Sequence, residues 1–344
     1  MKQGWEYKKI GNICNITTGK LDANAANEDG LYPFFTCSRI PLSINTYAYD
    51  CECILIAGNG DLNVKYYNGK FNAYQRTYIL QLKNDVNGVE MRYIFAFFNL
   101  YIEELRRKSI GGIIKYIKLG DLTNALLPLP DITTQLSIVS ELDKINELIR
   151  LKKEQLKDYD NLAQSIFYEM FGDPVENEKG WEVKKWKEVF NTILGKMLDK
   201  SKQINHLKQY KYLANMNVQW GYFDLKELRS MTFTDEELAK YELRNNDLLI
   251  CEGGDAGRCA IWKETDETIL FQKAIHRARL IDTDNADVVY IRYWMQFYKV
   301  NKGLKDYISK STIEHLTGDK LKRLPIPLPP LPLQHLFAQR IEQI

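Results

Sequence analysis

The sequence lacks the features that mark several classes of protein. It has no run of about 18 apolar residues, the length that a membrane-spanning helix needs. Its first residues, MKQGWEYKKIG, contain no apolar stretch of the kind found in signal peptides, so we expect a cytoplasmic protein. The six cysteines form no CxxC pair and the four histidines are scattered, which favours reduced thiols and predicts no metal site.

Familiar catalytic motifs are missing as well. The sequence has no G-x-x-x-x-G-K-[ST] phosphate loop, no G-x-S-x-G and no H-E-x-x-H. It also lacks the Asn/Asp-Pro-Pro-aromatic tetrad of amino-methyltransferases and a glycine motif for S-adenosylmethionine. The net charge of +2, from 47 basic and 45 acidic side chains, neither requires nor excludes nucleic acid, because local basic clusters decide such binding. We therefore expect a non-enzymatic chain that carries no cofactor.

What the sequence does contain is an internal duplication. Residues 4–20, GWEYKKIGNICNITTGK, align without gaps to residues 180–196, GWEVKKWKEVFNTILGK, with 8 of 17 positions identical. Further along, ILIAGNGD (54–61) resembles LLICEGGD (248–255), and each is an apolar run that leads into a glycine turn. A period of this length indicates duplicated domains rather than a solenoid, and 344 residues suffice for about two domains.

The duplication continues to the end of the chain. We match the aromatic segment RYIFAFF (92–98) with RYWMQFY (292–298). Residues 122–145, LTNALLPLPDITTQLSIVSELDKI, then align with residues 321–344, LKRLPIPLPPLPLQHLFAQRIEQI. Both copies of this last segment share a PLP motif, with a glutamine five residues after its final proline.

A long helix is predicted after the first PLP motif. Proline holds the preceding backbone extended, Asp131 offers an N-cap, and neither glycine nor proline follows until Gly172. Apolar positions, Ala163 among them, recur at alternating spacings of four and three and are broken only at Lys152. This is a heptad pattern on a helix of roughly 55 Å. The alternative is a surface helix that lies on its own domain. The predicted partner-binding seam comprises Ile138, Leu142, Ile145, Ile149, Leu156, Tyr159, Ile166 and Met170.

These patterns predict an α+β chain with two similar mixed α/β domains, separated by long coiled-coil helices. We place the first domain at residues 1–130, the spacer helix at 131–172, the second domain at 173–329 and a second helix at 330–344. Ile344 corresponds to Ile145, so we expect the second helix to be truncated.

Together these features resemble the DNA specificity subunit of type I restriction–modification systems. The resemblance rests on the paired GWE.KK openings with their GK ends, the glycine turns and the paired PLP…Q entries into helices. QKAI at 272–275 and STIEHL at 311–316 add to it, and the order and duplication of the motifs span nearly the whole chain.

The resemblance implies a function as well as a fold. Each globular copy would be a target recognition domain that reads one half of a split, asymmetric DNA site. The long helices would pack antiparallel, set the distance between the half-sites and dock the methyltransferase subunits, of which we expect two. Those subunits would bring S-adenosylmethionine, and a restriction (motor and nuclease) subunit, held indirectly, would bring ATP hydrolysis with Mg²⁺. A homodimer through the helix seam is a further expectation.

Polar windows at residues 58–78 in the first copy, and at 253–262 and 271–279 in the second, supply most of the candidate DNA contacts. Asn and Gln can pair with adenine, and Arg and Lys with guanine or phosphate. The lysines of the two GK ends and Lys115 in IGGIIKYIK (110–118) are added as candidate phosphate contacts. The alternative is that these residues bind nothing and form a solvated loop in the first copy and a strand with a basic outer face in the second. A scaffold whose loops grip proteins is the competing function. The candidates in the first copy are Lys20, Asn59, Asn63, Lys65, Lys70, Asn72, Gln75, Arg76 and Lys115. Those in the second are Lys196, Arg258, Gln272, Lys273, His276 and Arg277.

Overall fold

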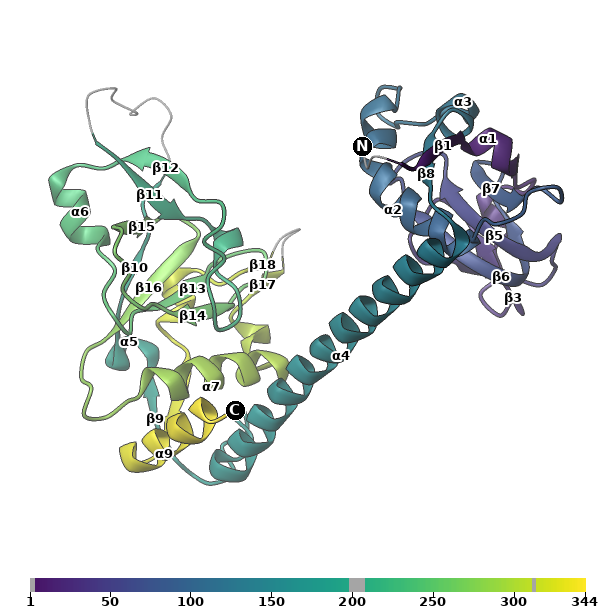
Figure 1. Ribbon diagram of the computed structural model, residues 1–344. Helices are drawn as coiled ribbons and strands as arrows, with labels where there is room; N and C mark the ends of the chain where they lie inside the picture. The colour runs from purple at the N-terminus through teal and green to yellow at the C-terminus, as the bar shows by residue number, and fades with distance from the viewer. Residues whose placement is uncertain (1–3, 198–207, 311–313) are drawn as a thin grey trace. The chain divides into compact units, whose positions relative to one another are not determined.

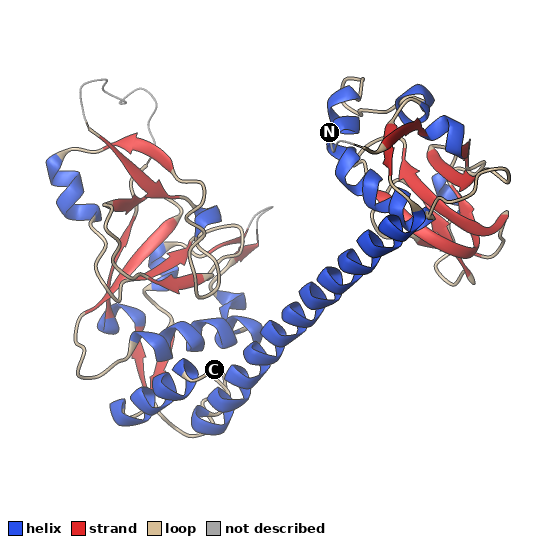
Figure 2. Ribbon diagram, in the orientation of Figure 1, coloured by secondary structure: helices blue, strands red, loops and turns tan. Residues whose placement is uncertain are grey.

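The computed structural model describes residues 4–197, 208–310 and 314–344. The chain divides into two units, Met1–Lys153 and Glu154–Ile344, and the division falls inside one long helix. Both units mix helices and strands, which confirms the predicted fold class (Figure 2). None of the helices in the described residues is long and apolar enough to span a membrane.

Unit 1 is built on a six-stranded sheet in the order β2-β7-β5-β6-β3-β4. The pairs are antiparallel except for β3 with β6. Helix α2 packs along β5 and β6, and β1 and β8 form a separate pair. In chain order the elements are β1 (Glu6–Lys9), α1 (Ile10–Ile13), β2 (Cys14–Thr18), η1 (Ala23–Ala25), β3 (Tyr32–Phe35), β4 (Leu42–Ile44), β5 (Tyr49–Ala57), β6 (Val64–Ala73), β7 (Thr77–Leu82), α2 (Met91–Lys108), α3 (Leu119–Thr123) and β8 (Leu126–Leu129), followed by the start of α4 (Ile132–Phe171).

Unit 2 repeats this plan in two smaller sheets, a four-stranded one in the order β10-β16-β13-β14 and a three-stranded one in the order β12-β11-β15. The second sheet has the pairing pattern of β4, β3 and β6 in unit 1. Helix α7 packs against β14 and against α9 (Figure 1). After α4 the elements are β9 (Glu182–Lys185), α5 (Trp186–Val189), β10 (Phe190–Leu194), β11 (Gln209–Leu213), η3 (Asn215–Asn217), β12 (Arg229–Thr232), α6 (Asp235–Tyr241), β13 (Leu248–Cys251), β14 (Cys259–Ile261), β15 (Ile269–Phe271), β16 (Ile275–Leu280), α7 (Val288–Val300), η4 (Gly303–Asp306), β17 (Ser309–Lys310), β18 (Glu314–His315), α8 (Gly318–Leu321), β19 (Pro325–Leu328) and α9 (Leu331–Glu342).

The two ends of each repeat pair with each other. Strand β1, from the GWEYKK motif, runs antiparallel to β8, with Glu6 opposite Leu129 and Lys9 opposite Leu126. Strand β9, from GWEVKK, pairs with β19 in the equivalent register. The repeated opening therefore serves the fold, because it pairs with the proline-containing strand that leads into the next helix.

A buried glutamine joins three segments of each unit. The Gln135 amide donates to the carbonyls of Pro130 (2.8 Å) and Gly88 (3.0 Å), and its Oε1 accepts from the Glu90 N–H (3.0 Å). Gln334 repeats the arrangement with the carbonyls of Pro329 and Asn285 and the Asp287 N–H. Both side chains are fully buried. This is the physical reason for a glutamine after each PLP motif, because its amide satisfies backbone groups that burial would otherwise leave unpaired.

The structure corrects our alignment of the aromatic segments. Tyr93 donates its hydroxyl to the Pro128 carbonyl (2.6 Å), and Tyr290 donates to the Pro327 carbonyl (2.7 Å). Helix α2 begins after its N-cap Glu90, and α7 begins after Asp287. Residues 92–98 therefore correspond to 289–295, not to 292–298. A shift of three residues is close to one helical turn, which keeps the same face aromatic and misled the comparison.

Helix α4 runs unbroken over 40 residues from Ile132 to Phe171. The Asp131 carboxylate accepts from the Thr134 backbone N–H (2.9 Å) at its start, as expected of an N-cap. At its end the Trp181 indole N–H donates to the Phe171 carbonyl (2.9 Å). Trp181 is half-buried and not part of a core, so it stabilises the end of the helix.

Candidate nucleic-acid interface

At the GK end of each repeat, the glycine backbone lies very close to the backbone of another segment. A Cβ on Gly19 would lie 2.1 Å from the Ala73 carbonyl oxygen, and one on Gly195 would lie 2.3 Å from that of Gln272. Only glycine fits there. In unit 1 the contact brings Leu21 beside Tyr74, and the Gln75 N–H donates to the Leu21 carbonyl (2.8 Å). The chain after Gly19 therefore runs beside the turn between β6 and β7.

Three chain segments of unit 1, together with Thr18 at the end of β2, line a pocket of about 480 Å³. They are the β6–β7 turn, the turn after β5 and the segment that leads into α3. The Gly58 N–H donates to the Arg76 carbonyl (2.8 Å), and the Ile117 N–H donates to the Gly58 carbonyl (3.0 Å). These hydrogen bonds fix the three segments side by side. The lining residues are Thr18, Gly58, Gln75, Arg76, Tyr78, Tyr116, Ile117, Lys118 and Leu119.

Five of the nine unit 1 candidates lie at this pocket or beside it. Gln75 and Arg76 line it, and both are exposed at the tip of the β6–β7 turn. Lys20 is exposed in the segment that pairs with that turn. On the opposite wall, Asn59 pairs with Tyr116, and the Lys115 carbonyl accepts from the Gly60 N–H (2.9 Å). The Gln75 amide also donates to Asp22 Oδ1 (2.7 Å), which orients it.

The other four unit 1 candidates are held elsewhere. Asn63 donates to the carbonyls of Cys37 and Asp61, both at 2.8 Å, and accepts from the Lys65 ammonium. Burial lowers the pKa of Lys65, which is half-buried. Asn72 is buried, and its Oδ1 accepts from the Ala73 N–H (3.0 Å). We assign these three to the fold and remove them from the candidate contacts.

Lys70 is exposed, but the structure does not place it among the residues that line the pocket. Its ammonium lies 4.7 Å from the centre of the Tyr47 ring.

The sequence comparison overlooked the aromatic side chains of the pocket. Tyr116 is exposed between Lys115 and Lys118, and Tyr78 donates its hydroxyl to the Ile117 carbonyl (3.2 Å). A tyrosine between two lysines in a glycine-containing turn was a usable signal, because nucleic-acid surfaces combine cations with aromatic faces.

In unit 2 the corresponding turn joins β15 to β16. There the Glu252 N–H donates to the Ala274 carbonyl (2.8 Å), just as the Gly58 N–H donates to the Arg76 carbonyl in unit 1. Ala274 is therefore equivalent to Arg76, and Lys273 is equivalent to Gln75. Lys273 is exposed and Gln272 is half-buried. These two are the unit 2 candidates that remain available for a ligand.

Two unit 2 candidates are buried in the core. His276 is 1% exposed, and its Nε2 lies 3.1 Å from the Leu316 carbonyl oxygen. Arg277 is 7% exposed, and it donates to the carbonyls of Lys240 (3.2 Å) and Glu242 (2.7 Å). Burial lowers the pKa of both side chains. Neither reaches the surface, so we assign both to the fold and correct the prediction that they contact DNA.

The remaining two unit 2 candidates are tied down within the unit. Arg258 donates to the Asn215 carbonyl (2.9 Å), the counterpart of the contact from Asn63 to Cys37 in unit 1. Lys196 donates to the Thr232 carbonyl (2.8 Å) and forms an ion pair with Glu237. Burial is the largest single effect on Glu237 and opposes its ionisation, but the hydrogen bonds from Lys196 and Thr234 and the charges of Lys196 and Lys240 together outweigh it, so the pKa of Glu237 is lowered. Lys196 is thus held in place, whereas its counterpart Lys20 is exposed.

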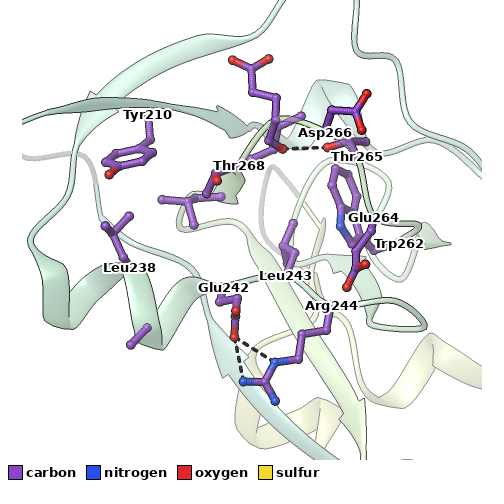
Figure 3. A pocket seen from close by; sticks show the side chains of 14 residues that line it. Tyr210, Leu238, Glu242, Leu243, Arg244, Trp262, Glu264, Thr265, Asp266 and Thr268 are labelled. Carbon is purple, nitrogen blue, oxygen red and sulfur yellow. Dashed lines mark hydrogen bonds and ion pairs between the residues drawn. The ribbon is translucent and has the colours of Figure 1, made fainter.

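A second pocket, of about 510 Å³, lies at an insertion in unit 2 (Figure 3). Strand β6 of unit 1 is continuous, but its equivalent in unit 2 is split into β14 and β15 by residues 262–268. Glu264, Asp266 and Glu267 rim the pocket, and Glu242 pairs with Arg244 (2.8 Å). Its acidic rim would repel phosphates, so this pocket does not suit DNA.

The predicted helix seam is exposed in its middle and buried at its ends. Met170 is buried in the core of unit 2 and Ile166 packs against that core, while Ile138 packs against the core of unit 1. These three serve their own units. The exposed seam residues are Leu142, Ile145, Ile149, Leu156 and Tyr159, and Leu148, Leu151 and Leu162 are exposed as well.

Comparisons with known proteins match both units. A family model described as the type I restriction modification DNA specificity domain matches residues 2–158 and again residues 178–344. The chain belongs to this family.

Known relatives align with nearly the whole of this chain. It is 25% identical to the EcoDI type I restriction enzyme specificity subunit of Escherichia coli, over 99% of this chain and 81% of that protein. It is 22% identical to the MjaVIII specificity subunit of Methanocaldococcus jannaschii, over 99% and 86%. The fold is similar to that of the type I restriction–modification S subunit from M. genitalium, with a TM-score of 0.56, 14% identity and coverage of 99% and 91%.

The resemblance derived from the repeated motifs is therefore confirmed. This is a type I specificity subunit that contains two copies of the family domain, one in each unit. The internal duplication read from the sequence is that pair of domains.

Proposed function

We propose that each unit of this specificity subunit reads one half of a bipartite, asymmetric site on duplex DNA. One observation carries the proposal: the same frame occurs twice, and each copy presents a different exposed polar turn. Unit 1 presents Gln75 and Arg76, and unit 2 presents Lys273 at the equivalent place. Two different turns on one frame suit two different half-sites, since amide and guanidinium groups discriminate between base edges.

Helix α4 sets the separation of the half-sites and docks the methyltransferase subunits in this proposal. A continuous helix is stiff, whereas a flexible linker would leave the half-site spacing undefined. Its exposed apolar row, from Leu142 to Leu162, is the surface on which two methyltransferase subunits, or a second copy of the chain, would pack.

The chain itself is proposed to be non-catalytic. S-adenosylmethionine would be bound by the methyltransferase subunits, and ATP and Mg²⁺ by the restriction subunit. Because the complex acts on chromosomal DNA, we propose the cytoplasm as its location. Methylation or cleavage of DNA by the purified chain alone would contradict the adaptor role.

The decisive experiment is long-read methylome sequencing of a host that carries this chain with its methyltransferase subunits. The expected result is one methylated motif with two defined half-sites and a fixed gap. Methylation that depends on this chain but occurs at a single continuous motif would overturn the proposal of a bipartite site.

A change in helix length tests the ruler function. Inserting seven residues within the exposed part of α4 keeps the apolar row in register and lengthens the helix by about 10 Å. The expected result is a changed gap between unchanged half-sites. Altered half-site sequences with the original gap would contradict the proposal.

Salt dependence separates DNA reading from the alternative of a protein scaffold. Phosphate contacts release counterions, so affinity for duplex should fall steeply between 50 and 200 mM salt. Duplex binding that stays undetectable at low salt with the methyltransferase subunits present would favour the scaffold. Sedimentation of the chain alone tests the homodimer, which a purely monomeric profile at high concentration would contradict.

A further inference from the structure

Unit 1 exposes two isoleucines that its own fold does not use. Ile113 is 104% exposed and Ile114 is 62% exposed, at the tip of the hairpin formed by residues 110–116. Side chains of this kind normally pack inside a protein, so the exposure of two adjacent isoleucines on a narrow tip indicates an external partner.

The hairpin is a defined structure. The Ile110 N–H donates to the Tyr116 carbonyl (3.0 Å), and the Tyr116 N–H donates to the Ile110 carbonyl (2.8 Å). Gly111 has a φ of +121°, and a Cβ there would lie 2.5 Å from the Ile114 carbonyl oxygen. Only glycine allows this turn, which holds the two isoleucines outward.

The base of the hairpin forms one wall of the candidate DNA-binding pocket. Tyr116 and Lys118 line that pocket, and the Gly60 N–H donates to the Lys115 carbonyl (2.9 Å). The hairpin tip is thus attached to the wall that faces Gln75 and Arg76.

The charge around the tip identifies the kind of partner. From Arg106 to Leu119 the sequence carries five cations, Arg106, Arg107, Lys108, Lys115 and Lys118, and no carboxylate. Lys115 and Lys118 are exposed on either side of Tyr116. Arg106, Arg107 and Lys108 form ion pairs with Asp61, Glu103 and Glu104, so Lys115 and Lys118 are the cations beside the tip that a ligand can use. An apolar tip next to two exposed lysines suits a polyanion with an apolar interior, which is duplex DNA with its stacked bases.

We propose that the 110–116 hairpin is a wedge that inserts Ile113 and Ile114 between adjacent base pairs from the minor groove, while Lys115 and Lys118 contact the flanking phosphates. The inference rests on the proposed function of unit 1 as a half-site reader. Aliphatic wedges of this kind unstack one base step and bend the duplex, and the buried aliphatic surface offsets the cost of unstacking. The equivalent tip in unit 2 falls at residues 311–313, outside the described residues.

The test uses the chain in complex with its methyltransferase subunits and a duplex that carries its methylated motif. The fluorescent base 2-aminopurine replaces each position of the half-sites in turn, because its emission rises when it is unstacked. The wild-type complex should raise the emission at one base step. The double variant Ile113→Ala, Ile114→Ala should lose that rise, and Ile113→Leu should keep it.

Affinity for a mismatched duplex gives a second readout. A mismatch at the wedge step already lowers the cost of unstacking, so the wild-type complex should bind that duplex at least about tenfold more tightly than the fully paired one. The double variant should show no such preference. The affinity of the double variant for the fully paired duplex should fall less than its affinity for the mismatched duplex. On the paired duplex, the loss of the apolar contact is offset by the loss of the unstacking cost.

A matched control is Leu31→Ala, which removes another highly exposed aliphatic side chain of unit 1. It should leave the emission and the mismatch preference unchanged. Sequence-specific binding without any emission change or mismatch preference would overturn the wedge but leave the reader function intact. A double variant that no longer assembles with the methyltransferase subunits would overturn it in favour of a protein contact. Absence of duplex binding by the wild-type complex would instead refute the proposed function.

Discussion

The two units share their buried frame and differ at their exposed turns. In both, the paired end strands, the glutamine amide and the tyrosine hydroxyl make the same contacts, through Gln135 and Tyr93 in unit 1 and Gln334 and Tyr290 in unit 2. At the turn between the equivalent strands, Gln75 and Arg76 are replaced by Lys273 and Ala274. A buried polar group requires its partner, whereas an exposed turn residue is free to vary. The variable turns are therefore where different half-sites would be read.

The largest expected effect comes from breaking the shared frame. Gln135→Ala leaves the Glu90 N–H and the carbonyls of Gly88 and Pro130 without a partner in a buried site, and Gln334→Ala does the same in unit 2. We expect each to lower the free energy of unfolding of its own unit by about 3 kcal/mol. Urea unfolding followed by hydrogen exchange of peptides from each unit measures the loss.

The exposed Gln339 on α9 provides the control. Gln339→Ala should change stability by less than about 0.5 kcal/mol. A loss below about 1 kcal/mol for Gln135→Ala, or an equal loss in both units from one substitution, would contradict a frame that stabilises each unit separately.

The next effect separates the two exposed turns. Arg76→Ala makes the unit 1 turn resemble that of unit 2, and we expect a loss of about 1–3 kcal/mol in binding with relaxed selection at one base of its half-site. Lys273→Ala should likewise relax selection at one base of the unit 2 half-site and leave selection in the unit 1 half-site unchanged. Competition binding with randomised half-sites distinguishes the two. If Arg76→Ala weakened binding to all sequences equally, Arg76 would contact phosphate and not a base.

Much of this comparison could be predicted from sequence, because covalent and periodic constraints leave direct marks. The PLP motif, the heptad pattern and the absence of glycine and proline up to Gly172 predicted α4, and the repeated GWE.KK opening revealed the duplication. The aromatic helices were misaligned by three residues, since a shift of nearly one turn preserves the face of a helix.

The residues that contact DNA were harder to predict from the sequence, because composition does not distinguish an exposed polar side chain from a buried one. Asn63, Lys65 and Asn72 read as groove residues but hold the loop around Cys37 and the end of β6. His276 and Arg277 were interpreted as a basic strand face, but consecutive strand residues point to opposite faces. The segment around Leu316 covers His276 on one face, and the end of α6 covers Arg277 on the other. The tertiary contacts from Asn63 to Cys37 and from His276 to Leu316 join residues 26 and 40 positions apart, and no local pattern encodes them.

A smaller effect concerns pH and only unit 2. His276 contacts the Leu316 carbonyl, and its counterpart Tyr78 contacts the equivalent Ile117 carbonyl in unit 1. Burial lowers the pKa of His276 below its ordinary value of 6.5. The unfolded chain then binds more protons than the folded one as pH falls below 6.5, so unit 2 should lose stability there and be insensitive above it.

Tyr78 is neutral throughout this pH range, because tyrosine ionises near pH 10 and burial raises its pKa further, so unit 1 has no acid-sensitive group at this position. Hydrogen exchange of each unit at pH 7 and at pH 5.5 measures the difference. His276→Tyr, which copies unit 1, should remove this part of the pH dependence. Equal acid sensitivity in the wild type and in that variant would show that other groups are responsible.

The smallest expected effect is an ion pair that unit 1 alone possesses. Arg92 on α2 donates two hydrogen bonds to Asp143 on α4, at 2.8 Å and 2.6 Å, and the equivalent of Arg92 in unit 2 is Val289. Both partners are nearly half exposed, so water and salt weaken their attraction. In a double-mutant cycle with Arg92→Met and Asp143→Asn, we expect a coupling free energy of about 0.5 kcal/mol that disappears in 1 M salt. A coupling above about 2 kcal/mol that persists in salt would mean that this pair, and not only the buried glutamine, sets how α4 joins unit 1.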